Sequence, residues 1–235
     1  MTDSVVYLQP AFILQSRNYR ESSLLVDAFT RDFGRIPLLA KGVRKPKSRS
    51  RGLLQPFIPL AVSFTGKAEL KTLTGVEIVH PYSALSGLAL YCGFYINELT
   101  VSFLHKYDPY PDVFVQYGDC LSQLAEGTAI EPVLRNFEIN LIDRIGYGLQ
   151  LEYDMINRKP VEPSKNYHFD IEQGPVEAGG GDFSGKTLQA INARDFTDPA
   201  VLSEAKVLIR RVLDVYLQGK PLKSRAVINS IFKQL

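Results

Sequence analysis

The spacing of hydrophobic residues changes near residue 80. Before that point, short runs of aliphatic, β-branched and aromatic residues alternate with turn-forming residues, which is the pattern of strands. The segment Arg31-Asp32-Phe33-Gly34 is one such turn, because glycine accepts a positive φ. Gly66 and Lys67 form another. We expect five strands, at residues 11–19, 22–30, 35–41, 59–65 and 70–79.

After residue 83 the hydrophobic residues recur at helical spacing. Leu134, Phe137, Leu141 and Ile145 fall on one face of a helix, for example. The pattern predicts helices at residues 83–107, 111–125, 132–145, 186–193, 199–218 and 224–234.

Residues 150–184 interrupt the helices with three prolines and a run of three glycines, and only 166–171 has the pattern of a strand, in a small hairpin. Strands followed by helices predict an α+β protein. Five is the strand count of a Greek-key OB-fold barrel. We therefore expect an OB-fold barrel at 1–80 and a mostly helical domain at 81–235, with a small irregular or β insertion near 150–184.

Charge is divided unevenly between these two parts. Residues 1–80 hold 12 lysines and arginines against 6 acidic residues, a net charge of +6. Residues 81–235 hold 15 against 19, a net charge of −4, so the total of +2 hides the difference. A basic N-terminal part predicts an anionic partner.

Much of this positive charge lies in residues 41–51, which we call the basic segment and which contain six cations and no acidic residue. Between two strands, such a segment presents charge to a phosphate backbone. The alternative is a solvated surface loop, but six uncompensated cations repel one another. Phe33, Phe57 and Phe64 are nearby candidates for base stacking, although such residues more often belong to a core. The candidate DNA-binding residues are Arg35, Lys41, Arg44, Lys45, Lys47, Arg49, Arg51 and Lys67.

A second motif is GGDFSGKT at residues 180–187, which matches the phosphate-binding pattern G-x-x-x-x-G-K-[ST] in full. That pattern binds nucleotide between a buried strand and a helix. The preceding residues, EQGPVEAGG, contain a proline and two glutamates and no apolar run. We therefore expect no nucleotide hydrolysis.

A candidate peptide contact lies on the expected helix at 132–145. Arg135 suits the terminal carboxylate of a partner peptide, and Leu134 and Phe137 suit an aromatic side chain of that peptide. The alternative is a core helix with an exposed arginine, which the sequence by itself favours.

Other chemistry is sparse. The three histidines lie far apart, and Cys92 and Cys120 form no CxxC pair, so we expect no enzyme activity, cofactor or metal. Two cysteines in apolar surroundings favour a reducing, cytoplasmic setting. The N-terminus lacks the signal-peptide pattern, and no apolar run reaches the length of a membrane span, so we expect no membrane association.

Five segments together resemble the RecO family of bacterial recombination mediators. They are LLAKGVRK (38–45), LLQPFIPL (53–60), YINEL (95–99), EPVLRNFE followed by IGYGL (131–149) and GKPLKSR (219–225), in an order that extends over nearly the whole chain. The resemblance implies an N-terminal OB fold and a helical C-terminal domain.

The resemblance also implies a function and partners. RecO-like proteins bind single- and double-stranded DNA, anneal complementary strands, and act with RecR, often with RecF, to help RecA replace the single-strand-binding protein SSB. They hydrolyse no nucleotide, and their C-terminal domain binds the acidic, aromatic tail of SSB, a contact that Arg135 suits. Many relatives have a four-cysteine zinc module, which this chain lacks. The resemblance thus implies a zinc-less, nucleoid-associated member.

Two other functions stay open at this point. The first is a non-enzymatic adaptor whose basic segment docks on an acidic protein. The second is a nucleotide hydrolase that uses residues 180–187.

Overall fold

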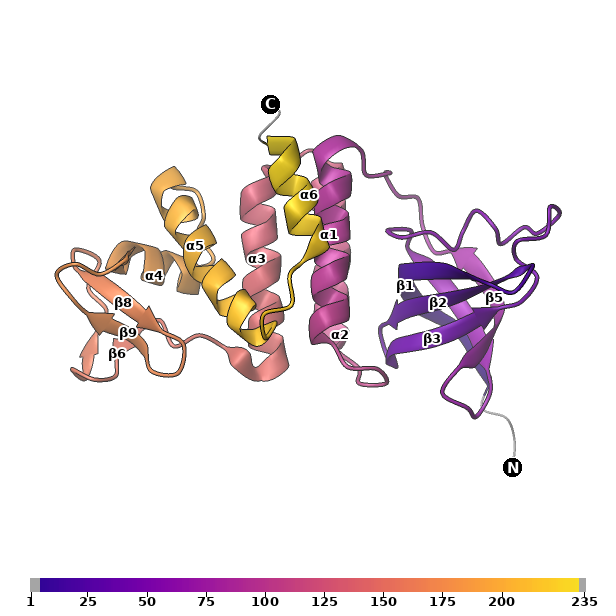
Figure 1. Ribbon diagram of the computed structural model, residues 1–235, viewed down its shortest axis with the longest axis horizontal. Helices are drawn as coiled ribbons and strands as arrows, with labels where there is room; N and C mark the ends of the chain where they lie inside the picture. Colours follow the sequence, from indigo (N-terminus) through magenta and orange to yellow (C-terminus); the bar gives the residue numbers. More distant parts are fainter. Residues whose placement is uncertain (1–4, 233–235) are drawn as a thin grey trace. The chain divides into compact units, whose positions relative to one another are not determined.

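A computed structural model describes residues 5–232 of the chain. The N-terminal strands close into a barrel in the order β1-β2-β3-β5-β4, with β4 pairing back onto β1 (Figure 1). Every pair is antiparallel except β3 with β5. This is the OB-fold topology, so the predicted barrel is confirmed. The strands are β1 (Val5–Tyr19), β2 (Ser23–Thr30), β3 (Gly34–Ala40), β4 (Leu60–Thr65) and β5 (Lys71–Ile78).

Strand β1 begins six residues before the predicted start at residue 11. It pairs with β4 through its first half and with β2 through its second half, so it must bend to close the barrel. Its register shifts between Val6 and Gln9, where Leu8 takes a left-handed φ of 49°. The predicted strand left out this half, in which Tyr7 and Leu8 are exposed.

The barrel interior is filled by aliphatic side chains from every strand, such as Ile13, Val26 and Leu38. The long connection from β3 to β4 adds Val43, Leu54 and Ile58 to the same core. That connection contains the basic segment, which is therefore anchored to the barrel by Val43 within it and by Leu54 and Ile58 after it.

Three helices belong to the same compact unit as the barrel: α1 (Gly87–Phe103), α2 (Pro111–Ala125) and α6 (Lys223–Phe232). Helix α1 is shorter than the predicted 83–107, since residues 80–86 precede it without regular structure. The last two residues of the predicted final helix lie outside the described part of the chain.

Polar contacts tie these helices to the barrel. The Asn97 amide donates to the carbonyl of Leu14 at 2.8 Å, and the Tyr117 hydroxyl donates to Asn97. Burial raises the pKa of Tyr117 well above its ordinary value, so this hydroxyl remains a donor.

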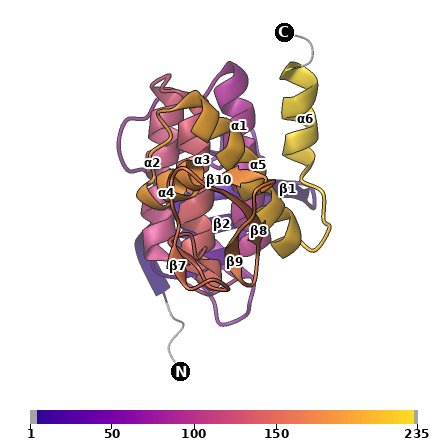
Figure 2. The same cartoon turned by 90° about the vertical axis from the view of Figure 1, so that its left-hand side faces the viewer.

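The second unit is formed by residues 129–221 and contains α3 (Ile130–Ile142), a π-helical turn (Asp143–Tyr147), α4 (Gly185–Ala193) and α5 (Pro199–Tyr216). The expected irregular insertion is a set of short strands beside α4 and α5 (Figure 2). The predicted hairpin is confirmed as β8 (Asn166–Asp170) with β9 (Gly174–Glu177), and β10 (Phe183–Ser184) pairs with β8. The strands β6 (Tyr153–Asp154) and β7 (Lys159–Pro160) form a separate sheet.

The buried carboxylate of Asp154 organises this insertion. It accepts backbone N–H groups from Ile156 and Asn157 in the β6–β7 turn and from Glu177 at the end of β9. No cluster of three or more metal-ligating side chains occurs within residues 5–232. Hydrogen bonds to Asp154 account for the local order of the described insertion.

The division into units differs from the predicted boundary at residue 80. Contacts group the barrel with α1, α2 and α6, and residues 129–221 are inserted between α2 and α6. The boundary at residue 80 stays a prediction. No helix in residues 5–232 is both long and apolar enough to cross a membrane.

Helix α6 is held in its unit by Glu98 of α1. The carboxylate accepts the backbone N–H groups of Lys223 and Ser224, each at 2.9 Å, and the Ser224 hydroxyl at 2.6 Å. Partial burial opposes ionisation of Glu98, but the bonds from Ser224 and Lys223 outweigh it and hold the pKa below its ordinary value.

Because this pKa is lowered by folding, Glu98 stabilises α6 above the pKa of the unfolded chain, about 4.3. That stabilisation is lost as the pH falls through the folded-state pKa. We expect Glu98→Gln at pH 7 to weaken α6 by about 1 kcal/mol, the usual value of a helix N-cap. Hydrogen exchange of the α6 amides measures this. Unchanged exchange in the variant would contradict the role of Glu98.

Candidate nucleic-acid interface

The basic segment is a series of turns fixed at one end of the barrel. Backbone bonds join Lys45 to Gly42, Ser48 to Lys45 and Arg51 to Ser48. Buried Val43, near the start of the segment, and buried Leu54, three residues after it, anchor it to the barrel core. The six cations are thus carried on an ordered support.

Most cations of the basic segment are exposed to solvent. Lys41, Lys45, Lys47, Arg49 and Arg51 are exposed, and Arg44 is half-buried. Within residues 5–232, none of the six forms an ion pair with an acidic residue. Their charge is therefore available to an anionic ligand.

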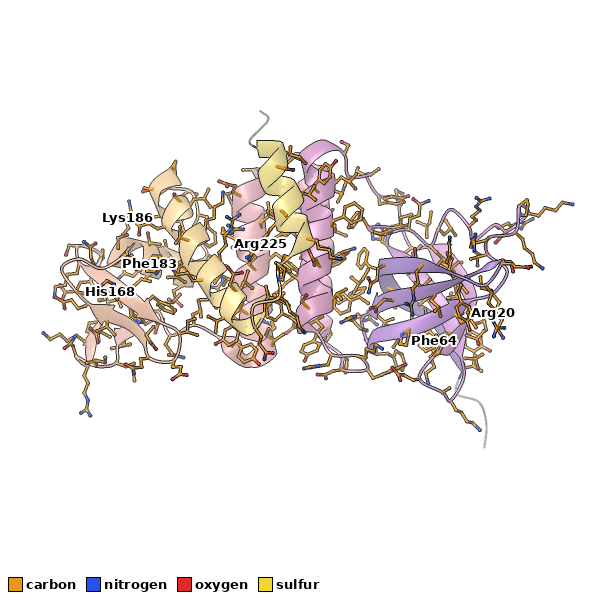
Figure 3. All side chains as sticks on the ribbon, in the orientation of Figure 1. Arg20, Phe64, His168, Phe183, Lys186 and Arg225 are labelled. Atoms are coloured by element: carbon orange, nitrogen blue, oxygen red, sulfur yellow. The ribbon has the colours of Figure 1, made fainter. Side chains whose placement is uncertain are left out.

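The turn between β1 and β2 lies at the same end of the barrel, since Leu24 pairs with Ala40 at the start of the basic segment. Arg44 joins the two turns: its N–H donates to the carbonyl of Ser22 at 2.9 Å and its Nη1 to the carbonyl of Arg20 at 3.1 Å. Exposed Arg20 extends the positive surface (Figure 3). Sequence reasoning missed Arg20, although the turn Asn18-Tyr19-Arg20-Glu21 between two strands was a usable signal.

Arg35 does not belong to this surface, and its inclusion among the DNA-binding residues needs correction. Its side chain pairs with Asp27 of β2 and donates to the carbonyls of Val101 and Leu104 at the end of α1. Only 7% of the residue is exposed. The guanidinium therefore bonds to a carboxylate and to the end of a helix inside the protein, and its role is structural.

Lys67 lies in the exposed turn between β4 and β5. Neighbouring residues of that turn line a groove of about 700 Å³ with Arg35 and Pro37, in the first half of β3. The basic segment follows the other end of β3. The groove also contains Arg17 and Lys106, two exposed cations that sequence reasoning missed. The proposed role of Lys67 stays a prediction.

The candidate aromatic residues have different environments. Phe64 is 4% exposed and packs in the barrel core (Figure 3), so it is not a stacking platform. Phe33 is 40% exposed and packs edge-on against Phe64. Phe57 packs edge-on against Phe94 of α1.

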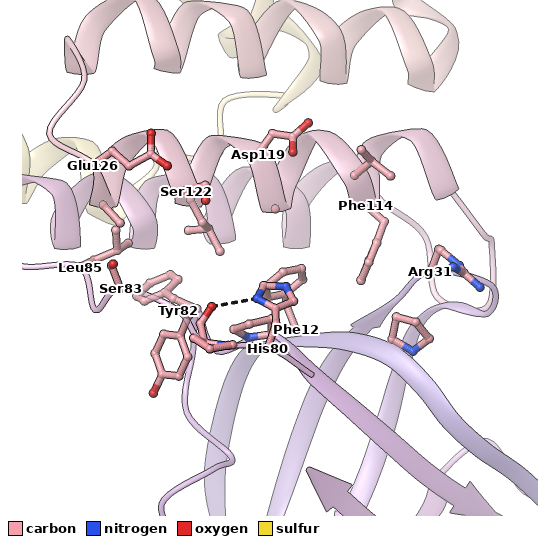
Figure 4. A pocket seen from close by; sticks show the side chains of 18 residues that line it. Phe12, Arg31, His80, Tyr82, Ser83, Leu85, Phe114, Asp119, Ser122 and Glu126 are labelled. Carbon is pink, nitrogen blue, oxygen red and sulfur yellow. Dashed lines mark hydrogen bonds between the residues drawn. The ribbon is translucent and has the colours of Figure 1, made fainter. Parts of the chain in front are cut away.

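A groove of about 650 Å³ between the barrel and α2 contains Phe57 with Phe12 and Phe114 (Figure 4). Asp119 and Glu126 line its helical wall. No cation of the basic segment lines this groove, and the two carboxylates repel phosphate, so it is a poor nucleic-acid site.

The GGDFSGKT motif is part of the packing of the second unit. A Cβ at Gly181 or at Gly185 would clash with the backbone of Tyr167 or of Glu162, so close packing requires these glycines. Glu204 accepts from the N–H and hydroxyl of Ser184, which caps α4. A carboxylate therefore already occupies the helix N-terminus where a phosphate would bind. Lys186 pairs with Asp198.

The three candidate peptide-binding residues lie in the interior, which differs from the exposed arginine that the sequence favoured. Leu134, Arg135 and Phe137 are buried, and Arg135 is 3% exposed. Arg135 pairs with Glu138, three residues on. Its Nε and Nη1 have no hydrogen-bond acceptor within the described residues.

Arg210 of α5 is in a related position. An ion pair between Lys206 of α5 and Glu131 of α3 joins the two helices. Arg210 lies one helical turn after Lys206, and Arg135 lies one helical turn after Glu131. The Nε of Arg210 is also buried with no acceptor within the described residues. Buried donors without acceptors are rare, and each one requires an explanation.

Comparison with known proteins identifies relatives over the whole length of the chain. Residues 1–82 match the family described as Recombination protein O N terminal, and residues 85–226 match Recombination protein O C terminal. The DNA repair protein RecO of Nitrosospira multiformis is 41% identical over 233 residues, covering 97% of this chain and 96% of the relative. The DNA repair protein RecO of Nitrosococcus oceani is 42% identical over 231 residues, covering 96% and 94%.

The structural assignment of Arg35 is testable. Arg35→Ala leaves Asp27 partly buried without its partner and removes the bonds to α1, so we expect the free energy of unfolding to fall by about 3 kcal/mol. Denaturant unfolding measures this, with Arg17→Ala as an exposed control in the same barrel. A variant of wild-type stability that no longer binds DNA would instead return Arg35 to the interface.

Proposed function

The chain belongs to the RecO family of DNA repair proteins, and on that premise we propose that it binds single- and double-stranded DNA through the basic segment. The observation that carries the proposal is a set of six cations without acidic partners on an anchored support. Cations that contact phosphates release counterions from DNA, which drives binding without reading sequence.

Strand annealing follows from the same surface. Two complementary strands repel each other through their phosphates. A positive surface that holds both lowers this repulsion and allows bases to pair. This chemistry requires no catalytic group, in keeping with a mediator that is not an enzyme.

We propose that the second unit binds the C-terminal tail of SSB at Arg135. Arg135 and Arg210 have buried donors that lack acceptors within the described residues, and a carboxylate of the acidic tail would satisfy them. The pair of Arg135 with Glu138 must then open or share its guanidinium with the tail. Leu134 and Phe137 are buried with Arg135, so they would contact an aromatic side chain of the tail only if the same opening exposes them.

These two contacts define a mediator. SSB recruits the protein through its tail, and the basic segment then engages the DNA that SSB covers. With RecR, and with RecF where it takes part, the protein helps RecA to replace SSB. We place this activity in the cytoplasm, in association with the nucleoid.

The alternative function is an adaptor whose basic segment docks on an acidic protein. The exposed cations suit either ligand. The salt dependence of the affinity for oligonucleotides separates the two functions. A surface that docks on a protein need not bind oligonucleotides with a steep salt dependence.

Six phosphate contacts with single-stranded DNA predict that log K falls with log[salt] with a slope of about −4. Replacing Lys45, Lys47 and Arg49 with glutamine removes three of these contacts and makes the slope shallower by about 2. Fluorescence anisotropy of labelled oligo-dT across a salt series measures both slopes. The matched control replaces Arg158, Lys159 and Lys220, three exposed cations of the second unit. An equal change in the control would contradict the assignment.

For the SSB tail, the informative change removes both charges of the buried pair, because removing Arg135 alone takes a cation away from a buried carboxylate. We expect the double variant Arg135→Leu with Glu138→Leu to fold and to bind an SSB-tail peptide at least tenfold more weakly. Its affinity for oligo-dT should match wild type. Calorimetric titration of the peptide measures the first effect. Undiminished tail binding by the folded variant would rule out Arg135 as the carboxylate contact.

A further inference from the structure

A hollow of about 730 Å³ opens beside the basic segment. It is lined by residues of the β1–β2 turn, Tyr19 to Ser23, and by Leu39, Lys41, Gly42 and Lys45. The hydrogen bonds from Arg44 to Ser22 and Arg20 hold its two sides together. Its volume is within the range of sites that bind small ligands.

The lining combines an aromatic ring with positive charge. The guanidinium of Arg20 lies over the ring of Tyr19, 5.2 Å from its centroid. Arg20 itself has a left-handed φ of 51°. Lys41 and Lys45 are exposed at the other side of the hollow and form no ion pair within the described residues.

We propose that this hollow is a stacking subsite for one nucleotide of single-stranded DNA. The base stacks on the Tyr19–Arg20 pair, and Lys41 and Lys45 hold the adjoining phosphates. Stacking on an aromatic ring is worth about 1–3 kcal/mol per base and accepts every base, and an arginine over the ring adds to it. The subsite rests on the proposed DNA-binding function and deepens it.

The subsite distinguishes single strands from duplexes. In a duplex the bases are paired and stacked inside, so they cannot reach Tyr19, whereas the phosphates still contact the basic segment.

Glu21 also lines the hollow and opposes a phosphate there. Its charge limits the affinity of the subsite.

The test compares three ligands of equal length: oligo-dT, an abasic strand with the same phosphates, and a duplex. We expect wild type to bind oligo-dT about tenfold more tightly than the abasic strand. Tyr19→Leu, which retains apolar bulk, should abolish that preference without changing duplex affinity. Tyr19→Phe should keep the preference, and Glu21→Gln should strengthen binding to oligo-dT.

A preference for oligo-dT that survives in Tyr19→Leu would overturn the subsite while leaving the basic segment as the DNA contact. Wild-type protein that binds none of the three ligands in a salt-dependent way would instead overturn the proposed function. Thermal unfolding of Tyr19→Leu establishes that a changed preference comes from a folded variant.

Discussion

The contacts of Arg35 determine how the barrel and its helices form one unit. Its guanidinium joins β2, through Asp27, to the carbonyls at the end of α1. Carbonyls at a helix C-terminus lack intrahelical partners and carry partial negative charge, so a cation there satisfies both needs. Because Arg35 is nearly fully buried, its charge is stable only while all these partners are present.

This constraint divides strand β3 into two functional ends. At the first end, Gly34 takes a φ of 64°, and a Cβ there would clash with the backbone of Asp108, so only glycine fits against the α1–α2 connection. At the second end, Ala40 leads into the basic segment, whose three lysines are exposed. The first end packs against the α1–α2 connection, and the opposite end presents charge on a segment held by turn hydrogen bonds and buried anchors.

Local patterns predicted much of the fold. The barrel strands, the six predicted helices with some shifted ends, and the basic segment follow from spacing and charge within short windows. The burial of Arg35 did not follow, because its partners in α1 are 66 and 69 residues away in the chain. The same reason hid the capping of α6 by Glu98, which is more than 120 residues distant.

In the candidate sites, too, local patterns are visible in the sequence, whereas burial and long-range contacts are not. The pair of Arg135 with Glu138 spans three residues, so the sequence contained the signal, but only packing shows that both are buried. In the insertion at 150–184, hydrogen bonds to Asp154 connect the short strands. Hydrophobic periodicity carries no sign of such bonds, so it could not predict most of these strands. The GGDFSGKT motif has the residues of a phosphate loop but uses them to pack strands and to cap α4.

We propose that DNA binds at the end of the barrel formed by the basic segment and the β1–β2 turn. Titration of isotope-labelled protein with oligo-dT, followed by amide chemical shifts, tests it residue by residue. We expect shifts concentrated at residues 19–23 and 41–51, with little change at Arg35 or in residues 129–221. Shifts confined to residues 129–221, with the basic segment unaffected, would contradict it.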